Sequence, residues 1–194
     1  MSLAVRLPVV TLLSSLALVG AVACSDSGDT YTPTGTGPAA KLRCTSSGKN
    51  AFDTFGAAAF VAVNESIFTN VNGEITAHDE TNLGSSFKHI GMPPPAALAD
   101  DAATFKGTLA AFLVFVYGGP DDIMYTDGKM YNGSEENMVV AHTGLAITAS
   151  QYTYFVTNIV VPALTSNGVT SDDVSSCFAP PLMDSMFMAS IVGH

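Results

Sequence analysis

Cationic residues are scarce in this sequence. Only 7 of its 194 residues are Lys or Arg, against 17 Asp or Glu, and the formal charge at pH 7 is −10. A protein that binds nucleic acid needs Lys and Arg to neutralise the phosphates. The charge balance therefore excludes a nucleic acid as the partner.

The motifs of several common catalytic sites are also missing. The chain contains no Gly-x-Ser-x-Gly, no His-Glu-x-x-His and no glycine-rich phosphate loop. Acidic residues do occur in pairs, at 121–122, 135–136 and 172–173. These pairs fall at turns or helix starts, where carboxylates interact favourably with the positive end of a helix dipole. We therefore interpret them as caps rather than as acid–base catalysts.

Long apolar runs are limited to the N-terminus. Residues 7–23 are uncharged and follow Arg6, but the run is short for a membrane span, so it is typical of a signal peptide. Cys24 comes next, and this junction resembles the lipobox of bacterial lipoproteins, although Ala21 stands where a larger apolar residue is usual. The resemblance implies an exported outer-membrane lipoprotein with a signal peptide over 1–23. An ordinary signal-peptidase site is the alternative.

Residues 24–43 are predicted to be a lipidated Cys24 and a flexible tether, because Ser, Thr, Gly, Pro and Asp dominate the stretch. Acylation of Cys24 would leave Cys44 and Cys177 as an even pair in an oxidising compartment. We expect them to form a disulfide that stabilises the domain by roughly 4–5 kcal/mol on the chain-entropy model. Two unpaired buried thiols are the alternative. No Cys-x-x-Cys occurs, which argues against thioredoxin-like, zinc-ribbon and c-type haem sites.

Residues 44–194 are enough for one domain, and their apolar periodicity is helical. Helices are predicted over 57–71, 102–117, 137–141, 148–164 and 171–191. Asn72-Gly73 should end the first of these, Thr148 should cap the fourth, Pro162 should kink it, and Pro180-Pro181 should break the last.

Between the first two helices, residues 75–101 show little periodicity and are predicted to be a long loop that holds His78 and His89. A strand remains an alternative for 112–117. The predicted fold class is all-α.

Several segments carry a family resemblance. Four segments of the sequence carry motifs that follow one another in an order similar to that in the truncated (2-over-2) haemoglobins: 63–68, 112–120, 131–133 and 141–148. In that family a phenylalanine-rich distal helix ends in Gly-Gly-Pro, a Tyr-x-Gly turn follows, and the histidine that binds the haem iron precedes Gly-x-x-Ile-Thr. The resemblance implies a globin-like 2-over-2 helical sandwich. Residues 75–101 depart from it, because they are longer than the family's linker.

The resemblance implies that His142 binds the iron of haem b. A neutral imidazole is a common haem ligand, and it needs an apolar shell and an acceptor for its second nitrogen. His78 and His89 are candidates for a sixth ligand. The other residues implied to contact the cofactor are apolar: Phe68, Phe87, Phe105, Leu109, Phe112, Met138, Ile147 and Phe155.

The family's polar distal positions fall on Phe68, Phe105 and Leu109, which cannot donate a hydrogen bond. Bound O₂ should then leave quickly, whereas NO and CO depend less on a donor. Thr108 and Tyr117 are the nearest polar side chains, and helical spacing turns Thr108 away from the Phe105–Leu109 face.

The resemblance thus implies an exported, membrane-anchored haem protein that binds a diatomic gas, NO or O₂, for sensing, scavenging or transport. Turnover of the NO dioxygenase kind would need an external electron donor. Two alternatives stay open, a haem-free structural or interaction lipoprotein and an electron-transfer haem protein.

Overall fold

The computed structural model describes residues 31–87 and 99–194, and within them the protein is mostly helical. The two longest helices are α1 (Ala51–His78) and α3 (Ala99–Val116). A short hairpin of β1 (Asp122–Met124) and β2 (Met130–Asn132) follows α3, with Ile123 opposite Tyr131. The predicted all-α class is therefore right in its main feature, although the sequence did not lead us to expect the hairpin.

The remaining helices form a short α4 (Met138–His142) and two longer rods. The first rod joins α5 (Ala149–Tyr154), the π-helical η2 (Phe155–Val160) and α6 (Val161–Ser166). The second joins α7 (Ser171–Asp173), the π-helical η3 (Val174–Phe178) and α8 (Ala179–Leu182), and α9 (Ser185–Ala189) follows it.

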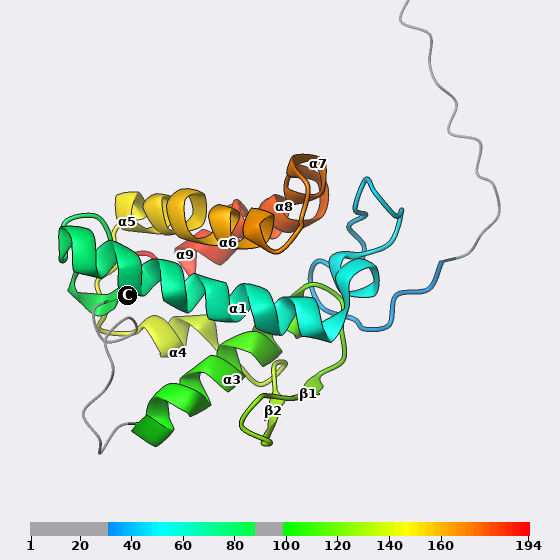
Figure 1. Ribbon diagram of the computed structural model, residues 1–194, viewed down its shortest axis with the longest axis horizontal. Helices are drawn as coiled ribbons and strands as arrows, with labels where there is room; N and C mark the ends of the chain where they lie inside the picture. Colours follow the sequence, from blue (N-terminus) through cyan, green and yellow to red (C-terminus); the bar gives the residue numbers. More distant parts are fainter. Residues whose placement is uncertain (1–30, 88–98) are drawn as a thin grey trace, which may run out of the picture. The chain divides into compact units, whose positions relative to one another are not determined.

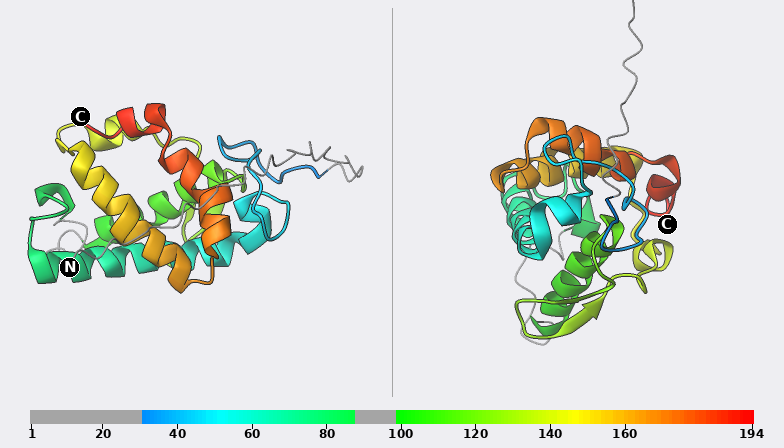
Figure 2. Two further views of the ribbon diagram at one scale, coloured as in Figure 1. Left: turned by 90° about the horizontal axis from the view of Figure 1, so that it is seen from above. Right: turned by 90° about the vertical axis from the view of Figure 1, so that its right-hand side faces the viewer.

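Helix α1 lies between two groups of elements (Figure 1). The rods that contain α5–α6 and α7–α8 lie on one side of it, and α3, α4 and the hairpin lie on the other. Viewed from above, the α5–α6 rod crosses α1 at an angle (Figure 2). Because α1 contacts α3, η2 and α6, its side chains can reach both groups.

Helix α1 is longer than its sequence predicts. Gly56, with φ 78° and ψ 164°, separates a first turn from the predicted stretch. The helix then runs past Gly73 to His78, so the predicted end at Asn72-Gly73 is wrong. Val71 and Ile75 are buried on the same side of the helix, and their packing outweighs the helix penalty of one glycine, about 1 kcal/mol.

The expected loop 75–101 is consequently shorter at both ends. Helix α3 begins at Ala99, before the predicted start, and it continues to Val116. The strand alternative for 112–117 is therefore wrong. A helical turn also forms at 85–87, and residues 88–98 lie outside the described part of the chain.

Both rods widen into a π-helix shortly before a proline. Pro162 follows η2, and Pro180 and Pro181 follow η3. A proline has no N–H and clashes with the carbonyl four residues earlier, so a wider turn relieves the clash. At Pro162, where a kink was expected, the helix instead accommodates the proline by the wider π-helical turn η2. The predicted break at Pro180-Pro181 is misplaced, because both residues lie in α8 and the helix ends after Leu182.

Residues 31–49 form a strap across one end of the helices. The Gly35 N–H donates to Gly118 O and the Ala39 N–H donates to Val116 O, each at 2.9 Å. A Cβ on Gly37 would lie 1.7 Å from Phe115 O, so only glycine permits this close approach. Residues 31–43 thus belong to the packed domain, which corrects the predicted flexible tether for that part.

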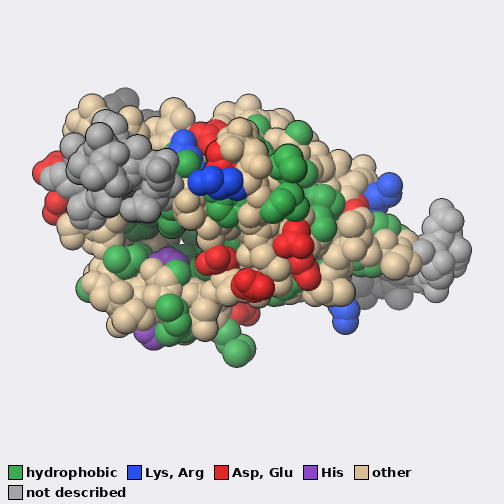
Figure 3. Space-filling model, turned by 90° about the horizontal axis from the view of Figure 1, so that it is seen from below, with side chains coloured by type: hydrophobic (Ala, Val, Ile, Leu, Met, Phe, Trp, Pro, Cys, Tyr) green, Lys and Arg blue, Asp and Glu red, His purple; other side chains and the backbone are tan. Residues whose placement is uncertain are grey.

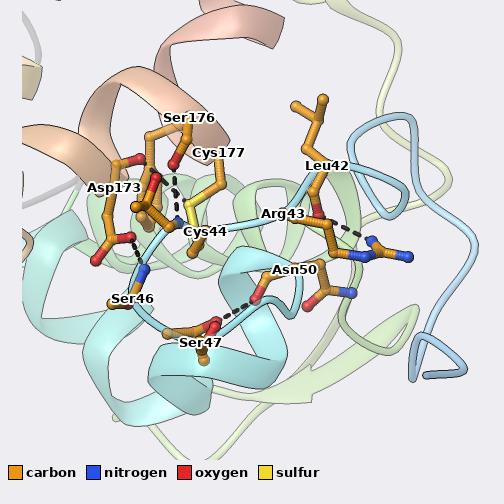
Figure 4. The surroundings of a disulfide bond; sticks show 12 residues. Leu42, Arg43, Cys44, Ser46, Ser47, Asn50, Asp173, Ser176 and Cys177 are labelled. Carbon is orange, nitrogen blue, oxygen red and sulfur yellow. Dashed lines mark hydrogen bonds between the residues drawn. A yellow bond between two sulfur atoms is a disulfide. The ribbon is translucent and has the colours of Figure 1, made fainter. Parts of the chain in front are cut away.

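The strap ends at the predicted disulfide, which is present. Cys44 and Cys177 are joined at an S–S distance of 1.99 Å and are buried (Figure 4). Beside them, the Asp173 carboxylate accepts from the Ser46 N–H at 2.9 Å and from the Thr170 hydroxyl at 3.1 Å. Burial alone would raise the Asp173 pKa, but these hydrogen bonds outweigh it and the pKa is lowered. Asp173 therefore fastens the strap to the start of α7, whose N-cap is Thr170.

None of the helices in the described residues is both long enough and apolar enough to span a bilayer.

Candidate functional site

A large cavity lies inside the helical domain. Its volume is about 430 Å³, and its walls come from α1, α3, the 136–147 segment and the two rods. Packed protein interiors hold few voids larger than a water molecule. A mostly apolar space of this size falls in the range of ligand pockets, so it has the properties of a binding site. On the underside of the molecule the surface is hollowed, with hydrophobic side chains in the hollow and acidic ones beside it (Figure 3).

Helix α4 stands over this cavity and presents His142 to it. The Asn137 side chain caps α4 by accepting from the Val140 N–H at 3.2 Å. None of the five residues of α4 is buried, and Val140 is 69% exposed. Because a helix this short is marginal in water by itself, it needs a surface to pack on, and its Met138 packs against the hydrophobic core.

The ring orientation of His142 is set by its own helix. Its Nδ1 lies 2.7 Å from Met138 O, and a carbonyl oxygen can only accept, so Nδ1 carries the proton. In the neutral imidazole this leaves the lone pair on Nε2 available. A fixed tautomer with a free nitrogen is the arrangement that metal-binding histidines have.

The structure brings most of the predicted contact residues together. His142 and the following apolar side chains line the cavity: Phe87, Phe105, Leu109, Phe112, Met138, Ile147 and Phe155. The Phe87 and Phe155 rings lie 5.0 Å apart between centroids. Residues from five separate parts of the chain thus meet around one space.

Phe68 is the exception, and its predicted place on the cavity wall is wrong. Its ring packs edge-on against Phe105 at 5.7 Å, and Lys106 Nζ lies 4.9 Å from its centroid. Ile67 and Val63 are the residues of this part of α1 that line the cavity. Adjacent helical positions differ by about 100° around the axis, so Ile67 and Phe68 do not face the same space.

The other histidines do not reach this cavity in the described structure. His78, which was expected in a loop, is the exposed last residue of α1 and is absent from the wall. His194 Nε2 lies 2.9 Å from Ala189 O. His89 and Cys24 lie outside the described residues. Among the described histidines, His142 alone lines the cavity.

Sequence reasoning named Thr108 and Tyr117 as the nearest polar side chains but missed Ser86 and Tyr152 on the cavity wall. Ser86, Tyr117 and Tyr152 line the cavity, and their hydroxyls donate to Leu145 O, Phe178 O and Leu182 O at 2.7, 2.8 and 2.6 Å. Thr108 also lines it, so the expectation that helical spacing turns Thr108 away is wrong. The position of Thr108 at the edge of the buried face of α3 was the only indication in the sequence that it could line the cavity.

Glu136 is a further wall residue, and it does not cap a helix as predicted, because Asn137 caps α4. Burial raises the pKa of the Glu136 carboxyl above its ordinary 4.5, and the negative charge of Glu135 adds to the effect. The folded protein therefore binds this proton more tightly than the unfolded chain does. Its contribution to stability is present below pH 4.5 and is lost as the pH rises through the raised pKa.

Glu136→Gln should remove this pH dependence. Because the amide has no charge to desolvate, we expect the variant to be more stable than the wild-type protein near neutral pH, and the difference to shrink in acid. Urea denaturation at a series of pH values measures it. Asp121→Asn, at an exposed position, is the matched control. Equal stabilisation by Glu136→Gln at every pH would contradict the prediction.

One group of side chains elsewhere has the proximity of a metal site. The Cys44 and Cys177 sulfurs and an Asp173 oxygen lie within 4.8 Å of one another. Both sulfurs are bonded to each other, so neither is a thiolate that could bind an ion. The role of this cluster is therefore structural: it holds the strap in place.

The wall residues fit a flat apolar cofactor with a metal at its centre. The cavity is mostly apolar, and it offers one imidazole with an available nitrogen. Haem b would fit both features, because its porphyrin is apolar and its iron takes an imidazole ligand.

Comparison of this chain with protein families, with curated proteins and with solved structures found no match.

Proposed function

We propose that the domain is a globin of the truncated kind that binds haem b in the central cavity. The observation that carries the proposal is His142, which lines a mostly apolar cavity of about 430 Å³ with Nδ1 held by Met138 O. Its Nε2 is then the ligand to iron. The sequence similarity over 112–148 supports the same assignment.

When bound, haem would supply an iron that takes up a diatomic gas reversibly. The chain's own residues would set the surroundings of that iron. Phe105, Leu109, Phe112 and Phe155 contribute apolar side chains without a hydrogen-bond donor, and Thr108 is the polar side chain that α3 adds to the wall. The apolar side chains favour NO and CO, which depend less on a donor than O₂ does. We therefore propose the sensing, scavenging or transport of a gas, with NO favoured over O₂.

Export and lipid anchoring remain predictions from the sequence, since residues 1–30 are outside the described structure. The Cys44–Cys177 disulfide supports export, because stable disulfides are typical of oxidising compartments. An anchor at Cys24 would place the domain at a bacterial outer membrane.

Titration of the purified chain with hemin tests the proposal. We expect one hemin to bind per chain and give a Soret band that shifts after reduction with dithionite and again after addition of CO. A protein that takes up no hemin would contradict the proposal and favour a haem-free scaffold. A ferric spectrum that is low-spin without added ligand would instead favour an electron-transfer protein with two strong axial ligands.

A further inference from the structure

The outer surface of helix α4 is apolar and faces solvent. Val139 and Val140 are 41% and 69% exposed, and Leu145 in the following loop is 39% exposed. The sequence has no Lys, Arg, Asp or Glu between residues 137 and 171, so no charged side chain from this segment interrupts the surface. Single apolar residues are common on protein surfaces, but a group of large ones marks an interaction site.

Acidic side chains adjoin this apolar surface. Asp121 and Asp122 lie at the start of the hairpin, and Glu135 and Glu136 directly precede the cap of α4. The Gly133 N–H donates to Asp121 O at 2.8 Å, which brings the two acidic pairs to the same end of the hairpin. Figure 3 shows acidic side chains beside the hollow that holds hydrophobic ones. We call the three apolar side chains and these four acids the acid-rimmed face of α4.

The four carboxylates of this rim have no cation to pair with among the described residues. Between residues 99 and 194 the sequence has two cations, and each lies near another acid. Lys106 Nζ is 2.7 Å from Glu65 Oε2, and Lys129 Nζ is 4.0 Å from Asp127 Oδ2. The remaining described cations belong to the strap: Lys41, Arg43 and Lys49. The negative charge of the rim is therefore left for a partner to neutralise.

Charge and apolar surface together select the occupant. A second copy of this chain would place acidic residues against acidic residues, and anionic lipid would repel them in the same way. A protein with basic residues around an apolar centre complements both properties. Because α4 also carries His142, such a partner would dock beside the cavity that we propose for haem.

We propose that the acid-rimmed face of α4 is the docking surface for a cationic redox protein that delivers single electrons to the bound haem. The inference rests on the proposed function, in which turnover of a gas needs an external reductant. In the transfer the donor loses one electron and the ferric iron gains it and becomes ferrous, and no bond forms or breaks. The acidic rim steers the donor towards α4, and Val139 and Val140 supply the apolar contact.

Cytochrome c, a cationic haem protein, is the probe for this surface. Its affinity for the full chain is measured by calorimetry without hemin. Stopped flow then follows electron transfer from the hemin-loaded, reduced chain to ferric cytochrome c, since electrons cross the same interface in either direction. Asp121→Asn/Asp122→Asn/Glu135→Gln should lower both the affinity and the transfer rate about tenfold at low salt. The difference should vanish at about 1 M salt, where the Debye length is about 3 Å.

The matched control makes the same change of net charge on the opposite side of α1. Thr153→Lys/Thr157→Lys/Thr165→Lys, at exposed positions of the α5–α6 rod, also raises the net charge by three and should have a much smaller effect (Figure 1). Val140→Gln should weaken binding severalfold at every salt concentration and leave the urea midpoint unchanged, because this side chain is mostly exposed. Oxidation by ferricyanide, a small anion that needs no docking surface, should not slow in any variant.

Several results would overturn the inference. Equal losses in the two triple variants would show that cytochrome c responds to net charge alone. Unchanged binding by Val140→Gln would show that the apolar centre is not in the interface. A wild-type chain that dimerises, and that Val140→Gln makes monomeric, would assign the face to a second copy. In each case hemin binding by the wild-type protein leaves the proposed function intact, whereas failure to bind hemin would overturn both.

Discussion

Replacement of His142 by alanine is expected to abolish stable haem binding. His142 is the described histidine on the cavity wall, and no cysteine lines that wall, so the variant has no comparable ligand for the iron. Loss of an outer partner of a metal ligand typically costs 10–100-fold in affinity, so loss of the ligand itself should cost about 100-fold or more. Hemin titration and the rate of hemin transfer to an acceptor protein measure this.

His78→Ala is the control, because His78 is exposed at the end of α1 and away from the cavity. That variant should bind hemin as the wild-type protein does. A His142→Gly variant should recover hemin binding when imidazole is added, because the free ligand can occupy the vacated space. Full haem occupancy in His142→Ala would show that another group holds the iron.

Removal of the disulfide should produce the largest loss of stability. Cys44 and Cys177 close a loop with a sequence separation of 133 residues. On the chain-entropy model, opening such a loop lowers the free energy of unfolding by roughly 4–5 kcal/mol. Since domains of this size are stable by about 5–15 kcal/mol, the double variant Cys44→Ala/Cys177→Ala should unfold at a much lower urea concentration.

Trypsin provides a second measurement on the same variant. Lys41, Arg43 and Lys49 flank Cys44 in the strap, so they should be cleaved faster once the strap is released. Reduction of the wild-type protein should reproduce the effect, and reduction of the double variant should change nothing. A double variant as stable as the wild-type protein would mean that the hydrogen bonds of the strap hold it without the disulfide.

The helical elements were predictable wherever a periodic apolar face met a local cap. Thr148 is the clearest example, because it forms a capping box with Gln151 at the predicted position. The end of α1 was not predictable in this way. Gly73 is a local stop signal, and the burial of Val71 and Ile75 that overrides it comes from contacts with distant parts of the chain.

The cavity was predictable in its apolar residues and in His142, but Ser86, Tyr152 and Glu136 were not recognised as part of its wall. Phe105, Leu109 and Phe112 share a helical face, which spacing alone reveals. Thr108 was misassigned because it stands at the edge of that face, where a small rotation of α3 decides which space a side chain enters. Phe68 was assigned from the family resemblance, and its ring packs against Phe105. Glu136 was interpreted as a cap, since the sequence gives no indication that its loop folds back over the core.

The disulfide also determines how the domain would respond to mechanical tension. Most of the cavity wall, from Phe55 to Val169, lies inside the covalent ring closed by Cys44 and Cys177. A force applied between residues 31 and 194 would pass through the sulfur–sulfur bond and could extend only the segments outside the ring. The segments that form most of the cavity wall would therefore not be extended by the force until the bond is reduced.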